Sequence, residues 1–285
     1  MTDTITESRL WLPSSEVEPH FRIPSREDLE GAWRIAHGAD VFLDLPDNIY
    51  GACAVPEENP TGYAVLDLCE VVRETALGVL KIRGGTLDDM VVDEQGSSLD
   101  YGSTHNGWAE HEDPQQKRQL IIQELMHYDL IPPVKMSEGI KALILSWKQK
   151  GVYVVADTST LPGCELSTIA FLSRQYEGCF DGILLPRNHD GKGDVTKADA
   201  FMETQRAIVA MHGEEAYKGP IVFIDDAAHH AIAFADAFAD ADIIMPEYEW
   251  NRVCEENSRI DRVTQTIGTI DAFVLADQFF RKKGV

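Results

Sequence analysis

Two adjacent carboxylates follow an apolar run in the last third of the chain. The segment IVFIDDAAHH (221–230) leads four apolar residues into Asp225 and Asp226, and then into His229 and His230. Burying two like charges side by side is costly unless a positive group neutralises them. Mg²⁺ takes oxygen ligands and usually keeps several waters, so one or two of these carboxylates would be enough to hold it. The alternative is that one aspartate caps the following helix and the other is solvated.

Alternating strands and helices must position these side chains. We predict strands at 152–157, 180–186, 219–226 and 241–246, and helices at 137–151, 165–176, 197–213, 229–239 and 268–283. This alternation indicates an α/β three-layer, Rossmann-like fold with a parallel sheet between helices. Ligands of such sheets bind at the carboxyl ends of the strands. The polar residues to inspect are therefore those that follow strands: Asp157, Thr158, Ser159, Arg187, Asn188, Asp225, Asp226 and Glu247.

The first half of the chain is less regular. ADVFLDLPDN (39–48) reads as a strand ending at Asp44, and LDDMVVDEQGSS (87–98) as a strand ending at Asp93. Between them, GYAVLDLCEVVRETALGVLKIRGG fits a long helix or a β-hairpin, and both stay open. Residues 111–129 are predicted to form a helix.

Three signals follow one another in a fixed order. A helix leads through a glycine to a strand in PPVKMSEGIKALILSWKQKGVYVVADTST, which ends near Thr158; a lysine opens a helix in GDVTKADAF at Lys197; and the acidic pair Asp225-Asp226 closes the next strand. In this order and spacing the region 137–246 resembles the haloacid dehalogenase (HAD) superfamily, and its layout is similar to the family's phosphatases and 5′-nucleotidases. Ser159 and Lys192 are the second choices for the hydroxyl and the lysine.

The resemblance implies a nucleophilic aspartate at the end of a first strand, with an acid two residues later. Asp93 fits without a gap but has Gln95 at the acid position, whereas Asp44 fits only if Pro46 is inserted, with Asp47 as the acid. Asp93 needs no insertion. Asp44 as nucleophile would leave no separate N-terminal domain to explain. Both stay open.

The remaining roles are also implied by the resemblance. Thr158 would donate a hydrogen bond to a phosphoryl oxygen, Lys197 would neutralise the phosphoryl group and the nucleophile, and Asp93, Asp225 and Asp226 would hold Mg²⁺. The implied activity is Mg²⁺-dependent phosphohydrolysis of a small phosphorylated metabolite, with a nucleoside monophosphate as the first guess, through an aspartyl-phosphate.

Gln95 keeps other functions open, because an amide cannot donate a proton as a carboxylic acid can. The alternatives are a catalytically degenerate HAD-like binding protein and a HAD-type dehalogenase or phosphonatase. The expected division of the chain is an N-terminal accessory region or cap at 1–86, and an HAD-like α/β core at 87–285 with a small helical insert at about 100–130.

Composition limits the partners. The 285 residues carry 48 acidic side chains against 25 Lys and Arg, a net charge of −23. Such a surface repels anionic backbones and membranes, so we expect no duplex nucleic acid and no membrane as partner. The scattered cysteines, the absence of a signal-peptide pattern and the lack of a long apolar run predict a cytoplasmic protein. Whether it forms a homodimer stays open.

Overall fold

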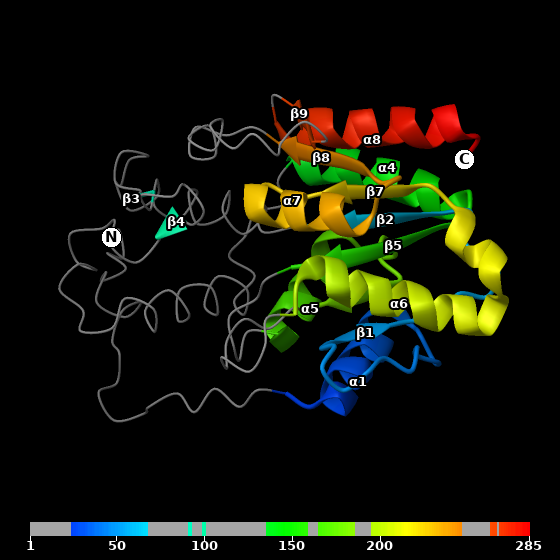
Figure 1. The fold of residues 1–285 in the computed structure, drawn as a ribbon. Coiled ribbons are helices and arrows are strands. Elements are labelled where there is room, and N and C mark those ends of the chain that lie inside the picture. Colours follow the sequence, from blue (N-terminus) through cyan, green and yellow to red (C-terminus); the bar gives the residue numbers. More distant parts are fainter. Residues whose placement is uncertain are drawn as a thin grey trace, which may run out of the picture.

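The protein is described by a computed structural model (Figure 1). The structure describes residues 24–67, 91–92, 99–100, 135–158, 165–185, 195–246, 263–266 and 268–285.

A seven-stranded sheet forms the centre of the fold, in the order β1-β6-β5-β2-β7-β8-β9. Only β1 is antiparallel to its neighbour, and the other pairs are parallel. The strands are β1 (Gly51–Cys53), β2 (Gly62–Leu66), β5 (Val152–Asp157), β6 (Gly182–Leu184), β7 (Ile221–Ile224), β8 (Asp242–Pro246) and β9 (Val263–Thr266). This arrangement confirms the predicted α/β fold with a mostly parallel sheet.

Helices cover both faces of the sheet, which gives three layers (Figure 1). One face is covered by α1 (Arg26–His37), α4 (Lys135–Gln149), α5 (Glu165–Gln175) and α8 (Thr269–Lys283). The other is covered by α6 (Lys197–His212), the short 3₁₀ helix η3 (Glu214–Lys218) and α7 (Ala228–Ala237). Strand β2 contributes to the hydrophobic interface on each face of the sheet. Ala64 and Leu66 pack against the helices of the first face, and Tyr63 and Val65 against those of the second.

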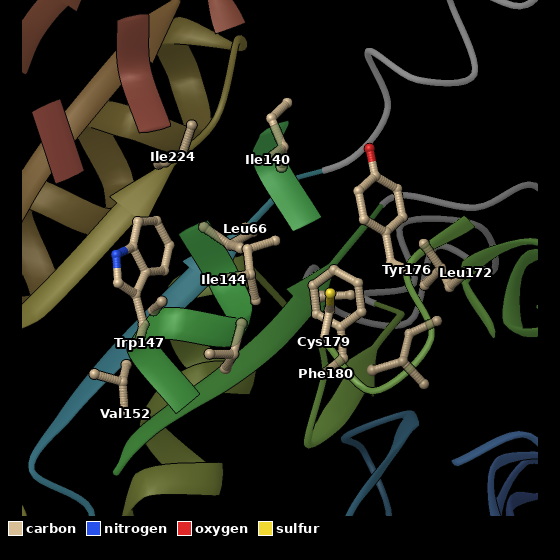
Figure 2. Packing of buried hydrophobic residues seen from close by; sticks show 14 of the residues in the cluster. Leu66, Ile140, Ile144, Trp147, Val152, Leu172, Tyr176, Cys179, Phe180 and Ile224 are labelled. Atoms are coloured by element: carbon tan, nitrogen blue, oxygen red, sulfur yellow. The ribbon is translucent and has the colours of Figure 1, made fainter. Parts of the chain in front are cut away.

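The first interface is built from large apolar side chains. Figure 2 shows Trp147 and Ile144 of α4 beside Leu66 of β2. The Trp147 indole also donates a hydrogen bond of 3.1 Å to Asp277 of α8, so its polar edge is satisfied inside the core. A core of this kind fixes α4 and α8 against the sheet that carries the candidate site.

Residues before position 86 contribute strands to the central sheet. Strands β1 and β2 belong to the same sheet as the strands of the second half, and β2 lies at its centre between β5 and β7. The segment left open between helix and hairpin therefore begins with a buried parallel strand. A strand covered on both faces shows no alternation of apolar and polar residues, which is why periodicity did not identify it.

Two other predictions concern segments in the first half of the chain. Residues 39–48 do not form the predicted strand, since only an isolated bridge joins Phe42 to Ala54. Near Asp93, β3 (Val91–Val92) pairs with β4 (Leu99–Asp100), while Asp93 itself and the predicted helix at 111–129 lie outside the described residues. Within the described residues, no helix is both long enough and apolar enough to span a membrane.

Close packing at Gly51 gives a first prediction. A Cβ atom there would lie 2.4 Å from the Ile183 carbonyl oxygen, a backbone atom of the paired strand β6. Gly51→Ala should therefore lower the free energy of unfolding by about 1–3 kcal/mol in urea denaturation. Gly31→Ala is the control, because nothing lies within 4 Å of a Cβ at this position of α1, and alanine should stabilise the helix by about 0.5–1 kcal/mol. Equal effects of the two substitutions would contradict this packing.

His37 gives a second prediction, for the pH dependence of stability. Its ring stacks on Trp33 with 3.9 Å between centroids, and burial, aided by Lys148, lowers the pKa of His37 from 6.5 to about 4. Between these values the unfolded chain binds a proton that the folded chain does not, so the His37 contribution to stability is lost as the pH falls from about 6.5 to about 4. We expect His37→Phe to flatten the measured fall in stability over this range. Parallel profiles of the two proteins would contradict the prediction.

Candidate active site

Lys197 lies between two buried carboxylates at the carboxyl edge of the sheet. Its Nζ atom is 2.8 Å from Asp67 Oδ2 and 2.7 Å from Asp225 Oδ2. The side chains of Lys197, Asp67 and Asp225 are 1%, 5% and 0% exposed. In surroundings that exclude water, the attraction between one ammonium and two carboxylates is strong. Removing any of the three groups leaves a buried charge uncompensated.

The register of two neighbouring strands brings the aspartates together. Leu66 of β2 pairs with Ile224 of β7, and Asp67 and Asp225 are the residues that follow. The Asp67 amide continues the ladder with a 2.8 Å hydrogen bond to the Ile224 carbonyl. Two like charges are therefore held at adjacent strand ends, where the chain must supply a positive group.

The start of α6 supplies that group. Thr196 and Asp199 form a capping box: the Thr196 hydroxyl oxygen accepts a hydrogen bond from the Asp199 amide, and the Asp199 carboxylate accepts one from the Thr196 amide. This cap fixes Lys197 as the first residue of the helix. A cation is unfavourable at a helix N-terminus, so the two carboxylates must offset that cost as well.

Every oxygen of the Asp225 carboxylate has a partner. Oδ1 accepts a 2.7 Å hydrogen bond from the Ala227 amide, and Oδ2 lies near Lys197 and 3.1 Å from His230 Nδ1. Burial by itself raises the pKa of Asp225, but the charges of Lys197 and then His230 outweigh it, and the pKa lies well below its usual range. Asp225 is therefore a carboxylate at neutral pH.

Asp157 is a third carboxyl group at this edge. It ends β5, and its neighbour Ala156 pairs with Leu66, so it lies beside Asp67. Its side chain is buried, and neither oxygen has a hydrogen-bond partner among the described residues. Burial raises the pKa of Asp157 well above its usual value; Lys197 opposes this, and Asp67 and Asp225 add to it. Three carboxyl groups thus share one lysine.

One group of side chains in the described part of the chain could hold a metal ion. It consists of Asp67, Asp225 and His230, whose ligand atoms all lie within 4.8 Å of one another. The residues fit a divalent cation, because the buried carboxyl groups outnumber the positive charges and the Asp157 oxygens lack partners. Such an ion would bind oxygen from Asp67 and Asp225.

The structure brings together only some of the residues predicted from sequence. Lys197 and Asp225 are in contact, and Thr158 is a buried residue directly after β5, whose amide donates a 3.1 Å hydrogen bond to the Leu184 carbonyl. Asp226 is buried beside Asp225 in the chain, but it is not part of the group of possible metal ligands.

The early aspartate beside Asp225 is Asp67. Asp44 and Asp47 are exposed in the segment that precedes β1, and neither belongs to the group of possible metal ligands. Their segment leads into an edge strand, while the acidic site is formed at the centre of the sheet. Asp93 lies outside the described residues.

Sequence reasoning missed Asp67 although a signal was present. The run YAVL before Asp67 has the same form as the run IVFI before Asp225, four apolar residues followed by an acid. The apolar pattern that continues after Asp67 also fitted a long helix, and this concealed the strand end. In the sequence, Cys69 stands two positions after Asp67, and it lies outside the described residues.

Comparison with known proteins gives one weak likeness. No protein-family model matches the chain, and no curated protein matches it significantly. Among solved structures, the chain is similar to one from Burkholderia xenovorans that is named for its likeness to haloacid dehalogenase-type hydrolases, with a TM-score of 0.38 and 13% identity over 75% of this chain and 98% of the other. A likeness of this size does not establish a shared activity, so the function must be inferred from the site.

The contact of Lys197 with both aspartates gives a third prediction. Without a metal ion, Lys197→Met leaves Asp67 and Asp225 buried without their counter-charge and should lower the free energy of unfolding by about 3–5 kcal/mol. The measurement is urea denaturation with a chelator present. Lys218→Met is the control, because Lys218 pairs with Glu215 at the surface and should contribute less than about 1 kcal/mol. If the two variants lose equal stability, the buried ion pairs are not as the structure shows them.

Proposed function

We propose that this chain is a metal-dependent hydrolase of the HAD type, which transfers a phosphoryl group from a small phosphorylated metabolite to Asp67 and then to water. The observation that carries the proposal is the convergence of Asp67, Lys197 and Asp225 at two adjacent strand ends. These residues follow one another in the order for which the sequence resembles that superfamily, and Asp67 takes the place of the nucleophile.

The proposed chemistry has two steps. A carboxylate oxygen of Asp67 attacks phosphorus and the bond from phosphorus to the leaving oxygen breaks, which gives an aspartyl-phosphate. Water then attacks the same phosphorus and gives up a proton to solvent, the bond to Asp67 breaks, inorganic phosphate is released, and the Asp67 carboxylate is regenerated. Mg²⁺ held by Asp67 and Asp225 would supply further neutralisation of the phosphoryl oxygens.

Lys197 and Thr158 support the transfer from the same edge. The Lys197 ammonium lies 2.8 Å from the attacking carboxylate, so it can hold that group in place and offset the negative charge of an incoming phosphate. Thr158 follows β5, which pairs directly with β2, and its hydroxyl would donate to a phosphoryl oxygen. Together they make a positive and hydrogen-bonding lining for an anion among otherwise acidic groups.

The leaving group must be a good one under this proposal. The residue two positions after Asp67 is Cys69, and a thiol is a much weaker acid than a carboxylic acid. The same observation favours a second candidate function, cleavage of a carbon–halogen bond with Asp67 as nucleophile. A halide leaves without being protonated, so that reaction would need no acid at position 69.

Substitution of Asp67 tests the proposal. Phosphate release from p-nitrophenyl phosphate and a nucleotide panel should depend on a divalent ion, and Asp67→Asn should lower it by about 1000-fold or more, because the amide is not a nucleophile. Asp44→Asn should retain the activity, since Asp44 is exposed and outside the site.

The same protein samples distinguish the alternatives. Halide release that is lost in Asp67→Asn, with no phosphate-ester hydrolysis, would replace the first candidate by the second. Activity that survives in Asp67→Asn and is lost in Asp44→Asn would contradict both. No turnover on any substrate would favour a binding protein without catalysis.

A further inference from the structure

His230 is the one nitrogen donor in the group of possible metal ligands that the described residues form. It is the third residue of α7, and its Nδ1 atom lies 3.1 Å from Asp225 Oδ2. Its ligand atom is within 4.8 Å of those of Asp67 and Asp225. An ion that binds both carboxylates is therefore within reach of an imidazole as well.

The unpartnered carboxyl group of Asp157 is an independent sign that this place takes a positive ligand. It is buried beside Asp67, it has no hydrogen-bond partner among the described residues, and the charges of Asp67 and Asp225 act on it. Lys197 contacts Asp67 and Asp225 and also acts on Asp157, so a single ammonium faces three carboxyl groups. A divalent cation close to these groups would remove the deficit.

The imidazole decides which divalent cation suits the site best. Mg²⁺ is a hard ion that prefers carboxylate, carbonyl and water oxygens, whereas imidazole suits the first-row transition metals. We propose that His230 is a metal ligand and that the site prefers a transition-metal ion of the Mn²⁺, Co²⁺ or Zn²⁺ class to Mg²⁺. This inference rests on the proposed function only in that it concerns the same site. It replaces Mg²⁺, the ion that the carboxylates alone would predict.

Two features of His230 suit that role. Its side chain is 17% exposed while that of Asp225 is fully buried, so it lies on the side of the site nearer to solvent, from which an ion must enter. The contact with Asp225 also orients the ring, so that Nδ1 faces the carboxylates that would bind the ion.

The chain offers a matched control in the neighbouring histidine. His229 is exposed, its ring centroid is 4.0 Å from that of His230, and it does not belong to the group of possible metal ligands. Asparagine in place of either residue removes the imidazole but keeps a hard oxygen donor. The pair of variants therefore separates the loss of nitrogen coordination at this site from the loss of any histidine.

The experiment measures metal binding to the full chain by calorimetry, with Co²⁺, Mn²⁺ and Mg²⁺ each added to metal-free protein. His230→Asn should weaken Co²⁺ binding by about 10-fold to 100-fold and Mg²⁺ binding by less than about 3-fold, and His229→Asn should change neither. Pulsed electron paramagnetic resonance of the Mn²⁺-loaded protein should show nitrogen coupling that disappears in His230→Asn and persists in His229→Asn. The thermal midpoints of both variants check that they are folded.

Several results would overturn the inference. It fails if His230→Asn weakens Co²⁺ and Mg²⁺ binding by the same factor, if it changes neither, or if nitrogen coupling is absent from the wild-type protein or persists in the variant. None of these readouts needs turnover, so they are independent of phosphate release. A protein that binds Co²⁺ through His230 but hydrolyses nothing would refute the proposed function alone.

Discussion

The buried contact of one lysine with two aspartates is the constraint on which the rest of the site depends. Asp67 and Asp225 are placed side by side because β2 and β7 are parallel neighbours in register. Two buried carboxylates side by side repel each other, and Lys197 at the start of α6 offsets this repulsion. Buried ion pairs contribute little net stability, since apolar residues of similar size in the same place often give a protein of equal or greater stability. Their presence here is better explained by what the charges do to a ligand.

The fold supports this contact from both sides of the sheet. On one face, α4 and α8 pack through Trp147, whose polar edge is satisfied by Asp277. On the other, α6 and α7 contact each other and bring Lys197 and His230 to the same carboxyl edge. Asp67 and Asp225 follow paired strands and Lys197 opens a capped helix, so the local backbone fixes where these groups start.

Much of the second half could be predicted from sequence, and the reasons are local. The strands at 152–157 and 219–226 and the helix that begins at Lys197 have clear apolar runs or caps, and their residues Thr158 and Asp225 lie where the strand-end argument places them. Asp67 could not be found in the same way, because its strand is buried on both faces and is followed by residues that also suit a helix. Asp44 follows a similar apolar run, but it is exposed and lies outside the group of possible metal ligands. Its apolar neighbours Leu43 and Leu45 are buried against the sheet from a segment that is not a strand.

Long-range pairing accounts for what remained hidden. Nothing in the local sequence states that residues 62–66 lie between two strands that follow them by about ninety and about 160 positions, and loop closure over such distances leaves no local pattern. Strand pairing over a long sequence separation also places Asp157 beside Asp67. The sequence alone does not show that the Asp157 oxygens lack hydrogen-bond partners among the described residues. His230 was noted in the sequence as a residue after the acidic pair, and only the geometry relates it to two carboxylates at once.

The central claim is that Asp67 is the residue on which the chemistry takes place. Its most direct test is acid quenching of the protein during turnover of a phosphorylated substrate, followed by peptide mass spectrometry that locates any covalently bound phosphoryl group. We expect the group on the peptide that contains Asp67, and on no other aspartate. A phosphoryl group on Asp44 or Asp93, with Asp67 unmodified, would contradict the account.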